Sequence, residues 1–204
     1  MFQSILKVYG HLHKKGVNQP DRGWGSADTG GAGLTTVVAV VLAAAGIFGL
    51  LRLFDSGSES ANLQDIATKT KGYMGGRSGY DFTSATTMTG NFIQRGLAPS
   101  GVKIVGDATS GSATMWNTWG GQILLTPVST GAGVNTGFSV TYNKVPQEDC
   151  ISFARQYGTG FFTAVSINST AHSDGRVSAE QGGKECTKDT GSTGTNTMVF
   201  TRNG

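Results

Sequence analysis

The sequence has few of the side chains that carry out catalysis or bind metals. Its 204 residues include three histidines and two cysteines, and charged residues make up only 14% of the chain. After Gly23 there is one histidine, His172, in a stretch rich in Ser, Thr and Gly, and no nucleophile motif accompanies it. We therefore expect His172 to be a solvated loop residue. We expect no enzymatic activity, no cofactor and no metal site.

An excess of basic residues is also missing from most of the chain. The formal net charge is +3, but the first 23 residues hold four of the 16 basic residues and one of the 13 acidic ones. The remainder therefore has twelve residues of each sign. A nucleic-acid-binding domain needs a basic surface, so this balance predicts no nucleic-acid partner.

Long apolar runs are absent except for one, from Leu34 to Leu51. These 18 residues carry no charge and are followed by Arg52. A helix of that length is about 27 Å long at about 1.5 Å per residue, close to the ~30 Å hydrocarbon core of a bilayer. The alternative is a buried helix of a soluble core, but no comparable apolar partner exists elsewhere in the chain. We therefore predict a membrane helix.

The basic residues lie on the N-terminal side of this run, which favours a cytoplasmic N-terminus and export of everything after Phe54. An ordinary secretory signal places its basic residues directly against the apolar stretch. Here a polar, glycine-punctuated spacer separates the two. The arrangement predicts cleavage inside the spacer, before the apolar run.

A helical pattern continues beyond the apolar run, over residues 55–75. Apolar residues recur at a spacing of three to four on one side: Ile47, Leu51, Phe54, Ala61, Leu63, Ile66, Ala67, Tyr73 and Met74. Polar residues lie between them: Glu59, Asp65, Lys69 and Lys71. The glycines of "YMGGRSG" end the pattern. We expect one long helix whose second half is amphipathic and packs on a protein surface.

Residues 76–204 have the pattern of an α+β domain. Two further helices are expected, one after Ser84 as cap and one after Pro146. Strands are expected in the stretches "GVKIVGD", "MWNTWGGQILLTPV", "GFSVTYNKV", "GFFTAVSIN" and "TNTMVFTRN". The polar segment 169–194 is predicted to be a loop. The fold class is therefore α+β, with a long N-terminal helix packed on an antiparallel sheet.

The two cysteines, Cys150 and Cys186, both fall on the side predicted to be exported. A disulfide is stable in an oxidising compartment, and it would stabilise the fold by about 4 kcal/mol on the chain-entropy model. The alternative is a metal site, but two distant cysteines without nearby histidines form a poor ligand set. We predict a structural disulfide.

Two smaller motifs have ordinary interpretations. Trp116 and Trp119 are three residues apart, which would place them on opposite faces of a strand, one in the core and one at the surface. Asn168, Ser169 and Thr170 match a glycosylation sequon, a tripeptide that also arises by chance.

Together these features resemble the type IV pilins, specifically the type IVb branch and its PilS-like enterobacterial group. That family has a basic leader ending in glycine, an acidic residue five positions after the cut, and a long helix followed by a disulfide-bonded head. The matching residues are Gly23, Trp24 as the new N-terminus, and Asp28; "MWNTWGGQILL" and "VPQEDCISFARQY" add to the likeness. The family usually has glutamate where this chain has Asp28. Three other glycines (Gly30, Gly31 and Gly33) have no acidic residue five places later.

The resemblance implies a division of the chain into four parts. Residues 1–23 would be a leader removed by prepilin peptidase, and 24–54 the half of the long helix that spans the membrane and later forms the filament core. Residues 55–75 would be the amphipathic half of that helix, and 76–204 the globular head with its C-terminal disulfide-bounded region.

The implied function is that of a major structural subunit of a type IVb pilus, used for adhesion, aggregation or conjugation. Its partners would be further copies of itself, prepilin peptidase, the inner-membrane assembly machinery and a host or bacterial receptor. The chain would wait in the inner membrane with its head in the periplasm, be methylated at Trp24, and end in an extracellular filament. The alternatives are a minor pilin, a secretion-system pseudopilin, or a signal-anchored extracellular binding domain.

The carboxylate of Asp28 has a physical reason to lie near the new N-terminus. A buried α-amino group is costly unless it is paired, and Asp28 could neutralise the amine of a neighbouring subunit. Asp28 could also simply cap the first helical turn. The two roles are compatible.

Overall fold

The structure is a computed structural model that describes residues 57–129 and 134–203. The described chain starts in an α-helix, residues 57–69, which continues as the π-helix η1 (Thr70–Met74). We call residues 57–74 the first helix. Its buried apolar residues, among them Leu63, Ile66 and Ala67, recur at helical spacing. Gly75 is extended and ends the helix, where the sequence predicts the end.

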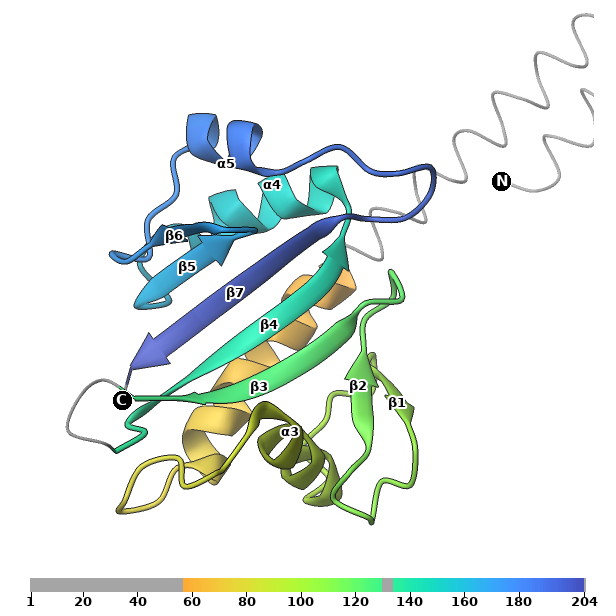
Figure 1. The fold of residues 1–204 in the computed structure, drawn as a ribbon, viewed down its shortest axis with the longest axis vertical. Helices are drawn as coiled ribbons and strands as arrows, with labels where there is room; N and C mark the ends of the chain where they lie inside the picture. Colours follow the sequence, from red (N-terminus) through yellow and green to blue (C-terminus); the bar gives the residue numbers. More distant parts are fainter. Residues whose placement is uncertain (1–56, 130–133, 204) are drawn as a thin grey trace, which may run out of the picture. The chain divides into compact units, whose positions relative to one another are not determined.

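Seven strands of the described residues form one sheet. They are β1 (Lys103–Val105), β2 (Thr114–Trp116), β3 (Gln122–Val128), β4 (Gly137–Val145), β5 (Ala164–Ile167), β6 (Thr170–His172) and β7 (Asn196–Asn203). Their order is β1-β2-β3-β4-β7-β5-β6, and every neighbouring pair is antiparallel. The last strand, β7, lies between β4 and β5 (Figure 1). The C-terminal strand therefore holds the two halves of the sheet together.

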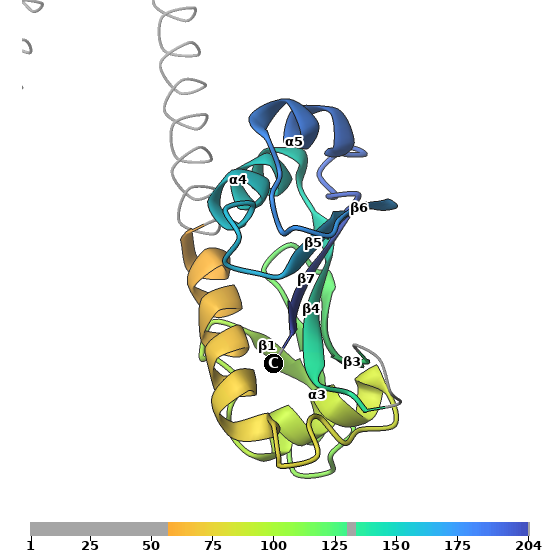
Figure 2. The ribbon, with the colours of Figure 1, turned by 90° about the vertical axis from the view of Figure 1, so that its left-hand side faces the viewer.

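The first helix runs along one face of this sheet (Figure 2). Strand residues alternate accordingly: in β3, Ile123 and Leu125 are fully buried, while Gln122 and Leu124 are half-buried. The part of the chain that the structure describes has three further helices: α3 (Ala85–Gln94), α4 (Gln147–Tyr157) and α5 (Ala179–Glu185). The α+β class, the antiparallel sheet and the helix packed on it are confirmed.

Both helices predicted from the sequence are present: α3 begins at its predicted cap, Ser84, and α4 begins directly after Pro146, which makes no side-chain cap hydrogen bond. The Ser84 Oγ accepts the N–H of Thr87 at 3.2 Å, and the Ser84 N–H donates to Thr87 Oγ1 at 3.1 Å, so α3 starts with a capping box.

Within α3, Gly90 has a packing role. A Cβ at Gly90 would collide with the backbone carbonyl of Gly111, so only glycine lets α3 approach the turn that precedes β2.

The prediction of a loop over 169–194 is wrong for two elements. The segment contains β6 and α5. α5 has the sequence "AEQGGKE", whose residues give no apolar periodicity, and only Gly182 is buried. It begins at a capping box in which the Ser178 Oγ accepts the N–H of Gln181. Capping and tertiary contacts, rather than an apolar stripe, therefore stabilise this helix.

Candidate functional sites

The residues predicted for processing and assembly, Gly23, Trp24 and Asp28, lie outside the residues that the structure describes, as does the apolar run 34–51. Within 57–129 and 134–203, no helix is both long enough and apolar enough to cross a bilayer. The same residues contain no cluster of three or more His, Cys, Asp or Glu side chains suited to a metal ion.

Cys150 and Cys186 form the predicted disulfide, with their Cα atoms 5.8 Å apart. Both residues are buried, at 0% and 2% exposure. Cys150 is in the first turn of α4, and Cys186 directly follows α5. The bond therefore attaches the polar helix α5 to α4, which packs against β7 and the core.

The expectation that His172 is a solvated loop residue is wrong. His172 ends the edge strand β6, is only 8% exposed, and its Nε2 lies 2.8 Å from Glu185 Oε2. The side chain of Asn168 reinforces this contact by donating to the carbonyl of Glu185 at 2.8 Å. The His172–Glu185 contact therefore holds the C-terminal end of α5 against the β5–β6 hairpin, next to the disulfide.

Asn168, the first residue of the sequon, is also part of the contacts between the β5–β6 hairpin, α5 and β7. Asn168 has φ = 53°, which suits the tight turn between β5 and β6. Its Nδ2 donates to Glu185 and Asn196, and its Oδ1 accepts the N–H of Thr197 at 3.0 Å. These bonds use the amide to join the turn to α5 and β7. Asn168 thus has a structural reason to be asparagine.

A buried carboxylate joins the first helix to the sheet. Glu59 is 0% exposed, although its place in the helical pattern suggested a polar side chain facing away from the core. Its Oε1 accepts the backbone N–H of Thr118 at 2.7 Å, and its Oε2 accepts a longer bond from Asn62 Nδ2 at 3.4 Å. Thr118 is in the turn between β2 and β3, so this bond ties the helix to that turn.

The ring of Tyr142, from the central strand β4, lies in the same part of the core and is fully buried. Burial, and then the nearby Glu59 carboxylate, raise the pKa of the Tyr142 hydroxyl well above its ordinary value of 10.0.

Trp116 and Trp119 are both half-buried, so the predicted division into one core and one surface residue is wrong: a turn rather than strand alternation separates them, and Trp119 only packs against the core from outside. Trp116 ends β2 and is half-buried. Trp119 packs edge-to-face on the buried Phe153, with ring centroids 5.9 Å apart. The chain reverses at Gly120, whose φ of 72° suits glycine.

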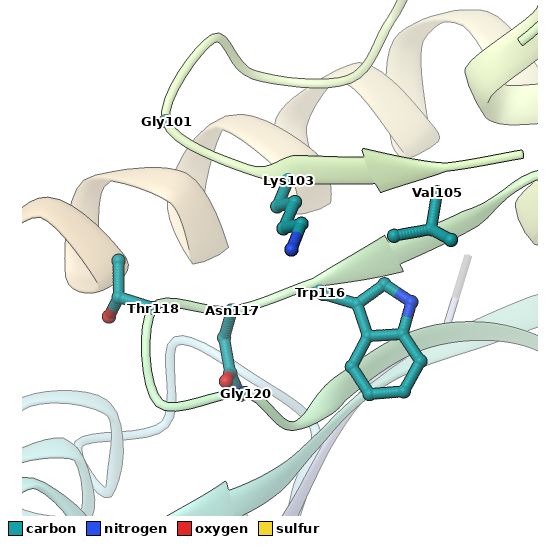
Figure 3. A pocket seen from close by; sticks show the side chains of 7 residues that line it. All are labelled: Gly101, Lys103, Val105, Trp116, Asn117, Thr118 and Gly120. Carbon is teal, nitrogen blue, oxygen red and sulfur yellow. The ribbon is translucent and has the colours of Figure 1, made fainter.

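Beside Trp116 the surface has a hollow of about 400 Å³ (Figure 3). We call it the Lys103 hollow; its lining comes from β1, β2 and the turns next to them, namely Gly101, Lys103, Val105, Trp116, Asn117, Thr118 and Gly120. The sequence alone does not reveal this hollow, because Lys103 and Trp116 become neighbours only through the register of β1 and β2.

Comparison with known proteins gives consistent matches over the described head. The family described as PilS N terminal matches residues 54–203. A crystal structure of a type IVb pilin from Salmonella typhi is 48% identical, with 72% of this chain and 99% of that chain covered and a TM-score of 0.64. An NMR structure of the type IVb pilin PilS from Salmonella typhi is 47% identical, with 74% and 97% covered and a TM-score of 0.51. A search of curated protein sequences found no match.

Proposed function

Because this chain belongs to the PilS family of type IVb pilins, we propose that it is the major structural subunit of a type IVb pilus. The observation that carries the proposal is the 48% identity to a solved type IVb pilin over 99% of that pilin's chain. A likeness of this extent covers the whole head rather than one motif. It favours a shared role as a filament subunit.

Processing would precede assembly. Prepilin peptidase would cut after Gly23, and the new α-amino group of Trp24 would be methylated. Before assembly, residues 34–51 would hold the chain in the inner membrane with its head in the periplasm. The composition of this run supports the location, since 18 residues without a charge are close to the length that spans a bilayer.

Assembly would replace lipid contacts with contacts between copies of the chain. Residues 34–51 would pack into a helical bundle, where small side chains such as those of Ala43, Ala44 and Ala45 allow helices to approach closely. The Asp28 carboxylate would pair with the Trp24 amine of a neighbouring copy, because an unpaired charge in an apolar bundle is costly. The head-to-tail contact that results does not close on itself, so it extends into a filament.

The head would form the outer surface of this filament. Its disulfide, its capped helices and the buried Glu59 contact favour a rigid unit that keeps its shape between the periplasm and the extracellular filament. Exposed loops would make contacts between subunits and present the surface used for adhesion, aggregation or conjugation. The inner-membrane assembly machinery and a host or bacterial receptor would be the further partners.

Two measurements test this proposal together: the protein composition of the filaments, and the presence of filaments on cells that lack this chain. Surface fibres are sheared from expressing cells, their protein composition is quantified, and cells lacking the gene are inspected by electron microscopy. We expect this chain to be the most abundant protein of the fibres, and the fibres to disappear when it is absent. A trace amount in fibres that persist without it would instead identify a minor pilin. Retention in membranes with no fibres would indicate an anchored binding domain.

A further inference from the structure

The Lys103 hollow lies at the β1 edge of the sheet and combines a cation with apolar surface. Lys103 and Trp116 are directly paired across β1 and β2, so their side chains emerge side by side on the same face. Val105 is two residues along β1, on that same face, and is 45% exposed. Figure 3 shows the Lys103 side chain extending from β1 over the hollow toward β2.

The walls of the hollow are held in place by hydrogen bonds. The indole Nε1 of Trp116 donates to Thr114 Oγ1 at 2.9 Å. Asn117 donates from Nδ2 to the carbonyl of Asn143 at 2.8 Å and accepts the N–H of Gly121 at 2.7 Å. With its N–H already bonded, the indole offers its ring as apolar surface. A site whose walls are fixed in this way loses little conformational entropy when a ligand binds.

Lys103 supplies a charge that no carboxylate of the described chain neutralises. Three ion pairs occur among residues 57–129 and 134–203: Lys69–Asp65, His172–Glu185 and Lys184–Glu180. Lys103 belongs to none of them, and its side chain is exposed. Gly120 leaves the hollow open at its rim, since a Cβ there would have no neighbour within 4 Å.

We propose that the Lys103 hollow binds a saccharide that carries a carboxylate, of the hexuronate or sialate class. The carboxylate pairs with the Lys103 ammonium group, and the apolar C–H face of the sugar ring packs on Trp116 and Val105. The Thr118 hydroxyl is placed to hydrogen-bond with the ligand's hydroxyl groups. The volume of about 400 Å³ is at the small end of ligand pockets, which suits one or two sugar rings.

The combination of side chains favours this ligand class over simpler ones. A small inorganic anion would use Lys103 and leave the indole ring without a partner. A neutral sugar would use the ring and leave the ammonium group unpaired. Because the hollow is open and its ion pair is exposed to solvent, each site binds weakly, and we expect a dissociation constant of about 1–10 mM. On the filament proposed above, many copies of the hollow would act together and raise the avidity.

The test follows the indole N–H resonance of Trp116 by NMR in the full-length chain, kept in detergent micelles with labelled tryptophan. Trp116→Phe assigns the signal. The probes are sodium glucuronate, glucose as the neutral counterpart, and acetate as a carboxylate without a ring. We expect a saturable shift with glucuronate, and shifts at least about threefold smaller with glucose and acetate at equal concentration. No shift with glucuronate, or equal shifts with all three probes, would overturn the proposal.

Matched variants locate the binding. Lys103→Gln is expected to weaken glucuronate binding about two- to fivefold, the range of an exposed ion pair. Lys184→Gln, which removes an exposed lysine on α5, is expected to leave binding unchanged. An unaltered Trp119 resonance shows that each variant is folded, since that ring packs on Phe153. Equal binding by the Lys103 variant and the wild type contradicts the proposal. Tighter binding of a tetraglutamate peptide than of glucuronate would also contradict the proposal, because it would identify an acidic protein segment as the occupant of the hollow.

Discussion

At the scale of single residues, Glu59 connects the first helix to the sheet through a 2.7 Å hydrogen bond with the N–H of Thr118. Glu59→Ala removes the acceptor and leaves this N–H without its partner. We expect the free energy of unfolding to fall by about 1–3 kcal/mol, the cost of an unsatisfied buried group. Glu59→Gln should lose less, because an amide oxygen remains to accept the bond. Denaturant unfolding followed by tryptophan fluorescence measures both.

Asp65→Ala is the matched control, because Asp65 is on the same helix and its 2.7 Å contact with Lys69 is a half-exposed ion pair at a spacing of four residues. Pairs of this kind contribute about 0.3–0.5 kcal/mol. A loss of stability in Glu59→Ala no larger than that of Asp65→Ala would show that the buried carboxylate has no special role.

Tyr142 is expected to make the folded head less stable at alkaline pH. Burial and the nearby Glu59 carboxylate raise the pKa of its hydroxyl in the folded state well above 10.0, while the unfolded chain ionises near 10. Below that pH both states keep the proton, and Tyr142 adds no pH dependence. Above it the unfolded state loses its proton first, so the free energy of unfolding falls as the pH rises toward the folded-state pKa.

Denaturant midpoints measured from about pH 9 to about pH 11 test this. Tyr142→Phe should reduce the slope of stability against pH in that range. Tyr73→Phe is the control, since Tyr73 is 65% exposed, and it should keep the wild-type slope. Identical slopes for the wild type and Tyr142→Phe would mean that Tyr142 is not a source of the loss of stability at alkaline pH.

At the scale of elements, α5 depends on the disulfide. Only Gly182 of this helix is buried, so its attachment rests on Cys186, the His172–Glu185 contact and its capping box. The Cys150→Ser, Cys186→Ser double variant should lose about 4 kcal/mol of stability on the chain-entropy model. Hydrogen exchange should show the amides of α5 opening before those of β3 and β4. Equal protection of α5 in the variant and the wild type would show that its other contacts are sufficient.

The elements that the sequence predicted are those with an apolar repeat or a clear cap. α3, α4, β5 and β7 have such patterns, and the structure confirms them. β6 and α5 were missed, because the first is three residues long and the second has no apolar stripe. A local pattern cannot identify an element that is held by residues far along the chain.

The same reason explains which site residues could be predicted. The disulfide was predicted because the chain has two cysteines and both follow the apolar run, and the structure confirms the bond. Burial of Glu59 depends on Thr118, and burial of His172 depends on Glu185, so the tertiary fold decides both. Gly23, Trp24 and Asp28 lie outside the described residues, and their roles stay predictions.

At the scale of the whole molecule, the proposed filament depends on Asp28, and its two possible roles can be separated. Serine caps a helix about as well as aspartate but carries no charge. Pairing with a neighbouring Trp24 amine therefore predicts that Asp28→Ser and Asp28→Ala are both processed but yield few filaments. Asp28→Glu, which keeps the charge, should assemble. Normal filaments from Asp28→Ser would leave only the capping role, and normal filaments from Asp28→Ala would exclude both.

The last strand of the described chain, β7, connects the two parts of the sheet in the head. β7 joins the β1–β4 part of the sheet to β5 and β6, so the last residues of the described chain lie in the middle of the fold. The first helix covers one face of the sheet, while the Lys103 hollow opens at the β1 edge (Figures 2 and 3). In this arrangement the helix would serve assembly and the sheet edge would remain available for a ligand.

The most direct test of the filament proposal is the N-terminal residue of this chain in sheared surface fibres, determined by mass spectrometry. We predict a chain that begins at Trp24 with a methylated amine, because cleavage after Gly23 precedes assembly. A chain that still begins at Met1, recovered only from membranes, would contradict both the processing and the assembly of the subunit.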